Sequence, residues 1–116
     1  MAAVIPSTGL ELLNANDDWL DAPAQDGVLI VLLGDMLERW TNGLFKASGH
    51  RVRNTPERRY SIVQFLAVDK DVVVEPLEPF VTAESPAKYA AIEQEQHIND
   101  EVSRAQENAR LSAAAD

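Results

Sequence analysis

The fold is indicated first by residues 28–43, which read VLIVLLGDMLERWTNG. The six apolar residues Val28–Leu33 form a continuous run bounded by turn signals, which predicts a strand buried on both faces. Gly34 interrupts that strand, and Asp35 is placed to cap a short helix with Glu38 three residues later. Apolar residues then follow at helical spacing, and the closing Asn-Gly pair ends the helix in a turn.

Outward from this stretch, the pattern predicts short strands on both sides. They are residues 9–13 and 19–21 before it, and residues 45–53, 59–68 and 72–74 after it. From Ser85 the sequence becomes polar and helical, with Pro86 at the first helical position. We therefore expect a lead-in over 1–8, a domain over 9–82, an outer C-terminal helix over 83–110 and a disordered tail over 111–116. The fold class is mainly β, with a short internal helix and a C-terminal α-helix.

Composition excludes several classes of function. The 116 residues suffice for one domain, and 10 basic against 19 acidic residues give a net charge of −9. A nucleic-acid partner is therefore not expected, because phosphate binding needs a basic surface. The absence of cysteine excludes thiolate metal sites and a cysteine nucleophile. The start has no signal-peptide pattern and no apolar run is long enough to cross a bilayer, so the expected location is the cytoplasm, with no membrane partner.

The two histidines, His50 and His97, are the candidate metal ligands. His50 lies in the predicted strand 45–53, with Arg51 and Arg53 on the opposite face because side chains alternate along a strand. A lone strand histidine is more often a hydrogen-bonded structural residue than a ligand. His97 lies on the polar terminal segment and is expected to be solvated.

A second candidate pair follows at Arg59 and Ser61, whose side chains leave the same face of a strand. A guanidinium beside a hydroxyl suits a carboxylate, because arginine binds both carboxylate oxygens in a planar fork. The alternative is that Arg59 is one of several surface cations, with Arg53 and Arg58. A hairpin between the two predicted strands would bring His50 and Arg59 onto one face. An imidazole beside a carboxylate clamp is what an iron centre needs when an oxo acid chelates the metal.

Three motifs in this order carry a resemblance that covers roughly residues 9–80. They are Gly34–Gly43, then His50-Arg51-Val52, then Arg59-Tyr60-Ser61-Ile62. Together they closely resemble the isopenicillin N synthase-like family of Fe(II)- and 2-oxoglutarate-dependent dioxygenases. The resemblance implies a double-stranded β-helix, or jelly roll, with Fe(II) inside and 2-oxoglutarate as cosubstrate. It implies that His50 is the distal iron ligand, that Arg59 and Ser61 bind the far carboxylate of 2-oxoglutarate, and that Asp35 is a helix cap and no ligand.

The resemblance also implies an activity, namely oxidation of a small organic substrate with decarboxylation of 2-oxoglutarate to succinate. The family's other two ligands come from a histidine-x-aspartate motif, and no histidine precedes His50 in these 116 residues. We therefore expect a partial jelly roll, a fragment that is inactive by itself and that can self-associate through exposed sheet edges. The alternatives are a non-catalytic remnant or binding module, a homodimer that rebuilds a barrel, and a family member that uses another reductant. Trp19 and Trp40 are expected to be packing residues.

Overall fold

The computed structural model describes residues 2–4, 9–23, 25–54, 56, 58 and 60–113. Its elements are, in chain order, β1 (Ala2–Val4), β2 (Leu10–Leu13), β3 (Trp19–Asp21), β4 (Ile30–Leu32), α1 (Asp35–Trp40), β5 (His50–Val52), β6 (Val63–Phe65), β7 (Val73–Val74), a 3-10 turn (Glu78–Phe80), β8 (Ile92–Glu93) and α2 (Gln94–Ala113). The predicted class, mainly strand with a short internal helix and a C-terminal helix, is confirmed.

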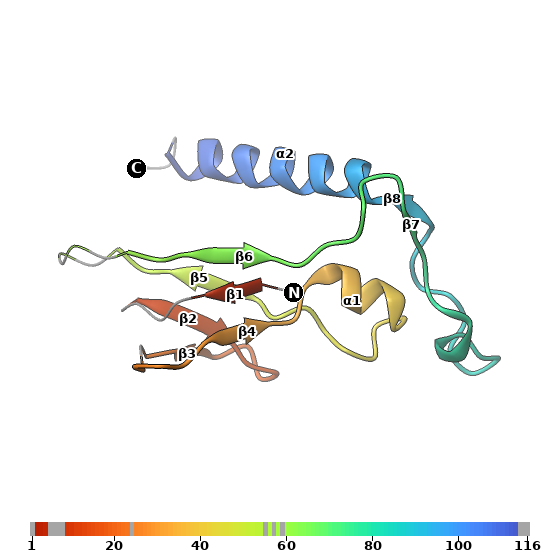
Figure 1. Cartoon of the computed structure of the whole chain (residues 1–116), viewed down its shortest axis with the longest axis horizontal. Coiled ribbons are helices and arrows are strands. Elements are labelled where there is room, and N and C mark those ends of the chain that lie inside the picture. Colours follow the sequence, from red (N-terminus) through yellow and green to blue (C-terminus); the bar gives the residue numbers. More distant parts are fainter. Residues whose placement is uncertain are drawn as a thin grey trace.

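The strands form two antiparallel three-stranded sheets and one small pair. The first sheet has the order β4-β1-β6, the second has the order β3-β2-β5, and β7 pairs with β8. From β3 to β6, successive strands therefore alternate between the two larger sheets, as they do in a jelly roll. The strands of the two larger sheets and α2 run roughly along the long axis of the molecule (Figure 1). No closed barrel forms among the described residues.

Two predictions about strand pairing were wrong. Residues 1–8 are not only a lead-in, since Ala2–Val4 forms the central strand of the first sheet and pairs with both β4 and β6. The predicted hairpin between the strands around His50 and Arg59 does not form among the described residues. β5 pairs with β2, whereas β6 pairs with β1 in the other sheet. The physical reason is that each strand finds its backbone partners in the N-terminal strands, so the chain crosses between sheets after β5.

The predicted two-sided burial of residues 28–33 was also wrong. Only Leu32 of this run is buried, whereas Leu29 and Val31 are 63% and 53% exposed. The buried apolar residues of the described chain are few, namely Leu10, Leu32 and Val74. An apolar run of this kind remains exposed because a two-layer fold buries a strand only where a second layer covers it.

The C-terminal helix α2 begins later than predicted. Residues 83–91 lack helical structure, and α2 spans Gln94–Ala113 instead of residues 83–110. Its first turn is held by backbone hydrogen bonds from Gln94 N to Val72 O (3.0 Å) and from Glu95 N to Lys70 O (2.9 Å). The predicted disordered tail 111–116 starts too early, because residues 111–113 are helical and residues 114–116 lie outside the described residues. Within the described chain, no helix has the length and apolar character needed to cross a bilayer.

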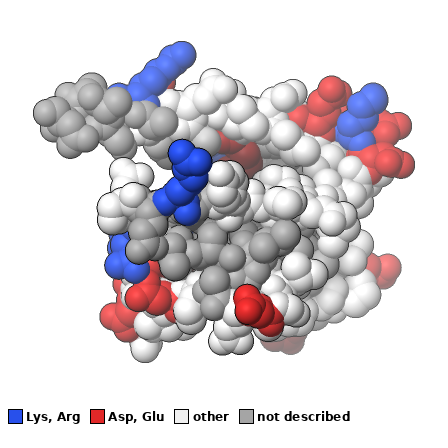
Figure 2. Space-filling view, turned by 60° about the vertical axis from the view of Figure 1, so that its left-hand side comes forward, with Lys and Arg blue, Asp and Glu red and all other residues white. Residues whose placement is uncertain are grey.

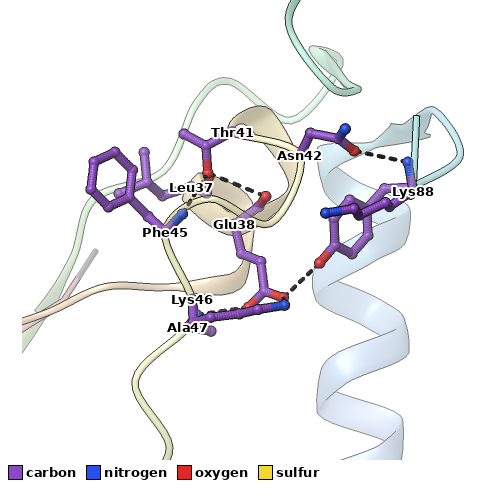
Figure 3. Close-up of polar contacts among 9 residues, drawn as sticks. Leu37, Glu38, Thr41, Asn42, Phe45, Lys46, Ala47 and Lys88 are labelled. Carbon is purple, nitrogen blue, oxygen red and sulfur yellow. Dashed lines mark hydrogen bonds and ion pairs between the residues drawn. The ribbon is translucent and has the colours of Figure 1, made fainter. Parts of the chain in front are cut away.

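The carboxylate of Glu38 on α1 joins three parts of the chain. It accepts hydrogen bonds from the Ala47 backbone N–H (2.7 Å), the Tyr89 hydroxyl (2.6 Å) and the Lys46 ammonium (3.2 Å). Figure 3 shows this carboxylate between the helix and the segment that leads to β5. The predicted capping box was wrong, because Gly34 is the N-cap residue and makes no side-chain cap. Glu38 thus fixes the route of the chain toward β5.

The hydrogen bonds to Glu38 shift two pKa values in opposite directions. The Ala47 N–H, the Tyr89 hydroxyl and Lys46 lower the pKa of Glu38 below its ordinary value of 4.5, although partial burial opposes the shift. The same carboxylate raises the pKa of Tyr89, since the hydroxyl must keep its proton to donate to Glu38. Lys46 itself is exposed, so its ion pair with Glu38 contributes little to stability.

This pKa shift predicts how the acid stability of the protein changes in Glu38→Gln. A lowered folded-state pKa stabilises the fold above the unfolded-state pKa, and this contribution is lost as pH falls through the folded-state pKa. We expect Glu38→Gln to lower the free energy of unfolding at neutral pH, and the difference from the wild type to shrink below about pH 4.5. Urea unfolding at several pH values measures this, with the exposed Glu84→Gln as the matched control. If the difference in unfolding free energy between Glu38→Gln and the wild type stays constant from neutral to acid pH, the pKa of Glu38 is not lowered in the folded state.

Candidate metal centre

His50 is the first residue of β5 and lies on the more apolar face of its sheet. The strand register places it opposite Leu12, which in turn lies opposite Leu20 on β3. Directly paired side chains share one face of a sheet. The His50 ring is exposed, and its Nδ1 lies 2.9 Å from the backbone oxygen of Ser48. If Nδ1–H donates to that oxygen, the lone pair of Nε2 is free to bind a metal.

The opposite face of the same strands is polar and sets their register. Arg51 and Arg53 both pair with Glu11 on β2, at 2.6 and 3.2 Å, and Arg53 also pairs with Asp21 on β3. The Arg51 guanidinium lies 4.1 Å from the ring centre of Trp19, a cation–π distance. The predicted alternation, with both arginines facing away from His50, is therefore confirmed. Trp19 packs against a cation at the surface and does not lie in the core.

Three consecutive residues before His50 are each anchored to a different part of the chain. The Ala47 N–H donates to Glu38, the Ser48 N–H donates to Leu33 O (2.8 Å), and Gly49 O accepts from Leu13 N–H (2.8 Å). A Cβ at position 49 would lie 3.2 Å from the Cβ of Leu13, which is tighter than ordinary contact. Glycine thus lets β2 and the start of β5 approach closely. These three hydrogen bonds hold the chain in place just before His50, in addition to the contact between the His50 side chain and Ser48 O.

The described residues fit one position of an iron site and do not complete the ligand set. His50 has the exposed Nε2 and the backbone-bonded Nδ1 that a metal-binding histidine requires. A non-haem Fe(II) site of this kind uses two histidines and one carboxylate. Among the residues that the structure describes, the one group of three potential ligands is formed by Asp35, His97 and Glu101, and it does not include His50. His50 can therefore be one ligand only.

Of the two residues predicted to bind 2-oxoglutarate, Ser61 lies within the described residues and Arg59 lies outside them. Ser61 lies two residues before β6 and is exposed to solvent. Because β6 belongs to the sheet opposite that of β5, any site that combines His50 with Ser61 must lie between the two sheets and not on one hairpin face.

The alternation of successive strands between two sheets is that of a jelly roll, and the exposed His50 is a residue that could bind a metal there. A family model for the 2OG-Fe(II) oxygenase superfamily matches residues 4–68, more than half of the chain. The chain belongs to this superfamily. The resemblance to isopenicillin N synthase-like dioxygenases is thereby confirmed, as are Fe(II) and 2-oxoglutarate as the cofactors of the family.

Individual relatives agree with the family. A homoarginine-6-hydroxylase of Glycine max is 36% identical over 74 residues, which cover 63% of this chain and 22% of that protein. The crystal structure of the rice dioxygenase for auxin oxidation matches with a TM-score of 0.80 and 26% identity, over 90% of this chain and 37% of that one. JOX2, solved in complex with 2OG, Fe and JA, matches with a TM-score of 0.74 and 25% identity, over 82% and 29% of the two chains. The chain thus spans well under half the length of these proteins.

Sequence reasoning missed two polar clusters. His97 is not solvated as predicted, because its ring is buried and its Nε2 lies 2.6 Å from Asp35 Oδ2. Asp35 is likewise no helix cap, since it is the first helical residue and its carboxylate faces α2. The other cluster surrounds Glu38, as described above. The sequence held one indication that His97 could be buried. His97 lies close to the apolar residues Ile98 and Val102 of the terminal segment, which form a loose stripe at helical spacing.

Proposed function

We propose that this chain supplies His50 as one of the Fe(II) ligands of a 2-oxoglutarate-dependent dioxygenase. The observation that carries the proposal is the geometry of His50, whose Nδ1 lies 2.9 Å from Ser48 O on the apolar face of the sheet, so that donation from Nδ1–H would make the Nε2 lone pair available to a metal. When bound, the iron and 2-oxoglutarate supply the oxidising chemistry, and the protein supplies ligands, orientation and electrostatics. The reaction we propose is hydroxylation or a related oxidation of a small organic substrate, with 2-oxoglutarate converted to succinate.

A histidine-x-aspartate pair outside these 116 residues would complete the iron site in this proposal, and the chain alone would be an inactive fragment. Exposed apolar side chains on the strands support this, because the inside of a complete jelly roll is covered. Val52 on β5 and Val63 and Phe65 on β6 are examples from the two sheets. Figure 2 shows broad uncharged areas between the charged groups of one face. In an isolated fragment, such surfaces and the open strand edges favour self-association.

The role of Arg59 and Ser61 in this proposal is to bind the far carboxylate of 2-oxoglutarate. A guanidinium forms two parallel hydrogen bonds to a carboxylate, and the hydroxyl adds a third. Small-molecule substrates suit the same site, since the structural relatives include a complex with JA. The proposed location is cytoplasmic. The comparisons support an enzyme family, and no observation favours the alternative of a non-catalytic binding module.

The test is anaerobic calorimetry with Fe(II) and 2-oxoglutarate, on this chain alone and on a longer protein that joins it to a histidine-x-aspartate half. In the longer protein, we expect Arg59→Ala to raise the 2-oxoglutarate concentration needed for half-saturation by about tenfold to a hundredfold. The matched control is Arg58→Ala, which removes the neighbouring exposed cation and should leave 2-oxoglutarate binding unchanged. Equal effects of the two substitutions on 2-oxoglutarate binding would show that Arg59 acts only as a surface charge and does not bind the carboxylate. In the longer protein, iron binding that requires 2-oxoglutarate and is fully retained in His50→Ala would contradict the proposed ligand.

A further inference from the structure

A second group of metal-competent side chains joins α1 to α2. Asp35 is the first residue of α1, and His97 and Glu101 lie one turn apart on α2. Each residue offers one ligand atom, and these atoms all lie within 4.8 Å of one another. Histidine and glutamate four residues apart project from the same face of a helix. The third side chain comes from a different element, so the arrangement is set by the tertiary fold.

The burial of His97 distinguishes this group from an ordinary surface cluster of acids. The His97 side chain is 5% exposed, and its Nε2 lies 2.6 Å from Asp35 Oδ2. Its Nδ1 is buried without a hydrogen-bond partner among the described residues, and so is Oε1 of Gln94 one turn earlier on the helix. A buried polar atom without a partner destabilises the folded state. The imidazole is therefore held in a protein environment that its hydrogen bond to Asp35 satisfies only in part.

The two unpartnered atoms suggest which tautomer the ring can adopt. As placed, these two atoms do not bond to each other, but Gln94 and His97 are neighbours on the helix, so a rotation of the Gln94 side chain would let a protonated Nδ1 donate to Oε1. Nε2 then directs its lone pair toward the Asp35 carboxylate, and the ligand atom of Glu101 lies within 4.8 Å of those of the other two residues. The separation of 2.6 Å between Nε2 and Asp35 Oδ2 is that of a hydrogen bond, and the two atoms would move apart to about 3.3 Å to share one tetrahedral metal ion.

We propose that Asp35, His97 and Glu101 bind a divalent transition-metal ion such as Zn²⁺, which fastens α2 to α1. One imidazole and two carboxylates suit Zn²⁺ or Co²⁺, and a water molecule can complete a tetrahedral set. Mg²⁺ and Ca²⁺ prefer oxygen ligands alone, so they fit this group less well. The site shares no residue with the proposed iron site around His50. It would stabilise α2, whose apolar residues Ile98 and Val102 remain about half exposed.

Zn²⁺ titration of the whole chain by calorimetry tests this site, together with the visible absorption of bound Co²⁺. We expect one tightly bound ion per chain, lost in His97→Gln and weakened at least about tenfold in Glu101→Gln, since loss of even an outer partner typically costs that much. Asp100→Asn removes a neighbouring exposed acid of the same helix and should bind Zn²⁺ like the wild type. His50→Ala should also retain the ion, which separates this site from the proposed iron ligand.

Thermal unfolding provides a second readout that does not require His97→Gln to fold. At one Zn²⁺ concentration, the unfolding temperature should rise in the wild type and in His50→Ala, and should rise less in Glu101→Gln, because a ligand that binds only the folded state stabilises it by an amount that grows with its affinity. An equal rise with Mg²⁺ would overturn the proposal in favour of general binding to carboxylates. Zn²⁺ binding that is unchanged in Glu101→Gln, or that is lost in His50→Ala, would also overturn it. Absence of Zn²⁺ binding would leave the group as a hydrogen-bonded histidine–aspartate pair, and would overturn the proposal equally.

Discussion

Asn42→Ala is expected to lower the free energy of unfolding by at least about 3 kcal/mol. Asn42 is 2% exposed and follows the last turn of α1. Its amide nitrogen donates toward the backbone oxygens of Phe80 (3.1 Å), Ser85 (3.2 Å) and Pro86 (3.0 Å), and its Oδ1 accepts from the Lys88 N–H (2.8 Å). Alanine would remove these part-buried hydrogen bonds, at about 0.5–1.5 kcal/mol for each bond.

The backbone of Asn42 adds a second cost to the same substitution. Its φ is 52°, in the left-handed region that asparagine tolerates and alanine disfavours by about 1–2 kcal/mol. Asn42→Gly removes the hydrogen bonds but keeps this conformation accessible, so it should be less destabilising than Asn42→Ala by about 1 kcal/mol. The difference between the two variants in urea unfolding thus separates the backbone contribution from the hydrogen bonds.

Asn42→Asp separates the two ends of the side chain. Aspartate keeps the acceptor for Lys88 N–H and tolerates the same φ, but it replaces the donating amide with an anion facing three carbonyl oxygens. We expect it to destabilise the fold as much as Asn42→Ala at neutral pH, and less at acid pH, where a protonated carboxyl can donate. An unfolding free energy of Asn42→Ala within about 0.5 kcal/mol of the wild type would contradict this account, because ordinary surface substitutions have effects of that size.

The features that the sequence predicted correctly are those fixed by neighbouring residues. The strands around Leu12 and Leu20, the turn between them, and the short helix that ends at Asn42-Gly43 all depend on local patterns of apolar and turn-forming residues. The features that failed depend on distant partners. β5 and β6 could not be assigned to different sheets from their own sequences, because those partners are β2 and β1. The late start of α2 has a similar cause, since the Asn42 side chain holds residues 85–88 in a non-helical path.

The candidate site was predictable to the same extent. Strand alternation correctly placed His50 and the two neighbouring arginines on opposite faces, and the motif order indicated the family. The anchors before His50 were not predictable, because Glu38 was interpreted as part of a helix cap and its contacts to Ala47 and Tyr89 join residues far apart in the sequence. The burial of His97 was missed for the same reason, since a polar helix sequence does not show which residue faces α1.

His50→Ala is expected to abolish iron-dependent turnover in a protein that carries the complete ligand set, by more than about a hundredfold. The same substitution should change the free energy of unfolding little. The His50 ring is exposed, and the one hydrogen bond recorded for its side chain joins Nδ1 to Ser48 O. Circular dichroism and urea unfolding measure the fold, while succinate production measures turnover. Loss of turnover with an intact fold is what removal of a metal ligand predicts.

Chemical rescue by free imidazole distinguishes a lost ligand from a displaced strand. Because the His50 ring is exposed and its neighbours are anchored independently through Glu38, Leu33 and Leu13, His50→Ala should leave an accessible gap beside a correctly placed strand. Added imidazole should therefore restore part of the iron binding and of the turnover in His50→Ala, but not in Arg59→Ala, where a carboxylate clamp is missing. Full turnover by His50→Ala without imidazole would show that His50 is a structural strand residue, and the iron site would then have to be assigned elsewhere.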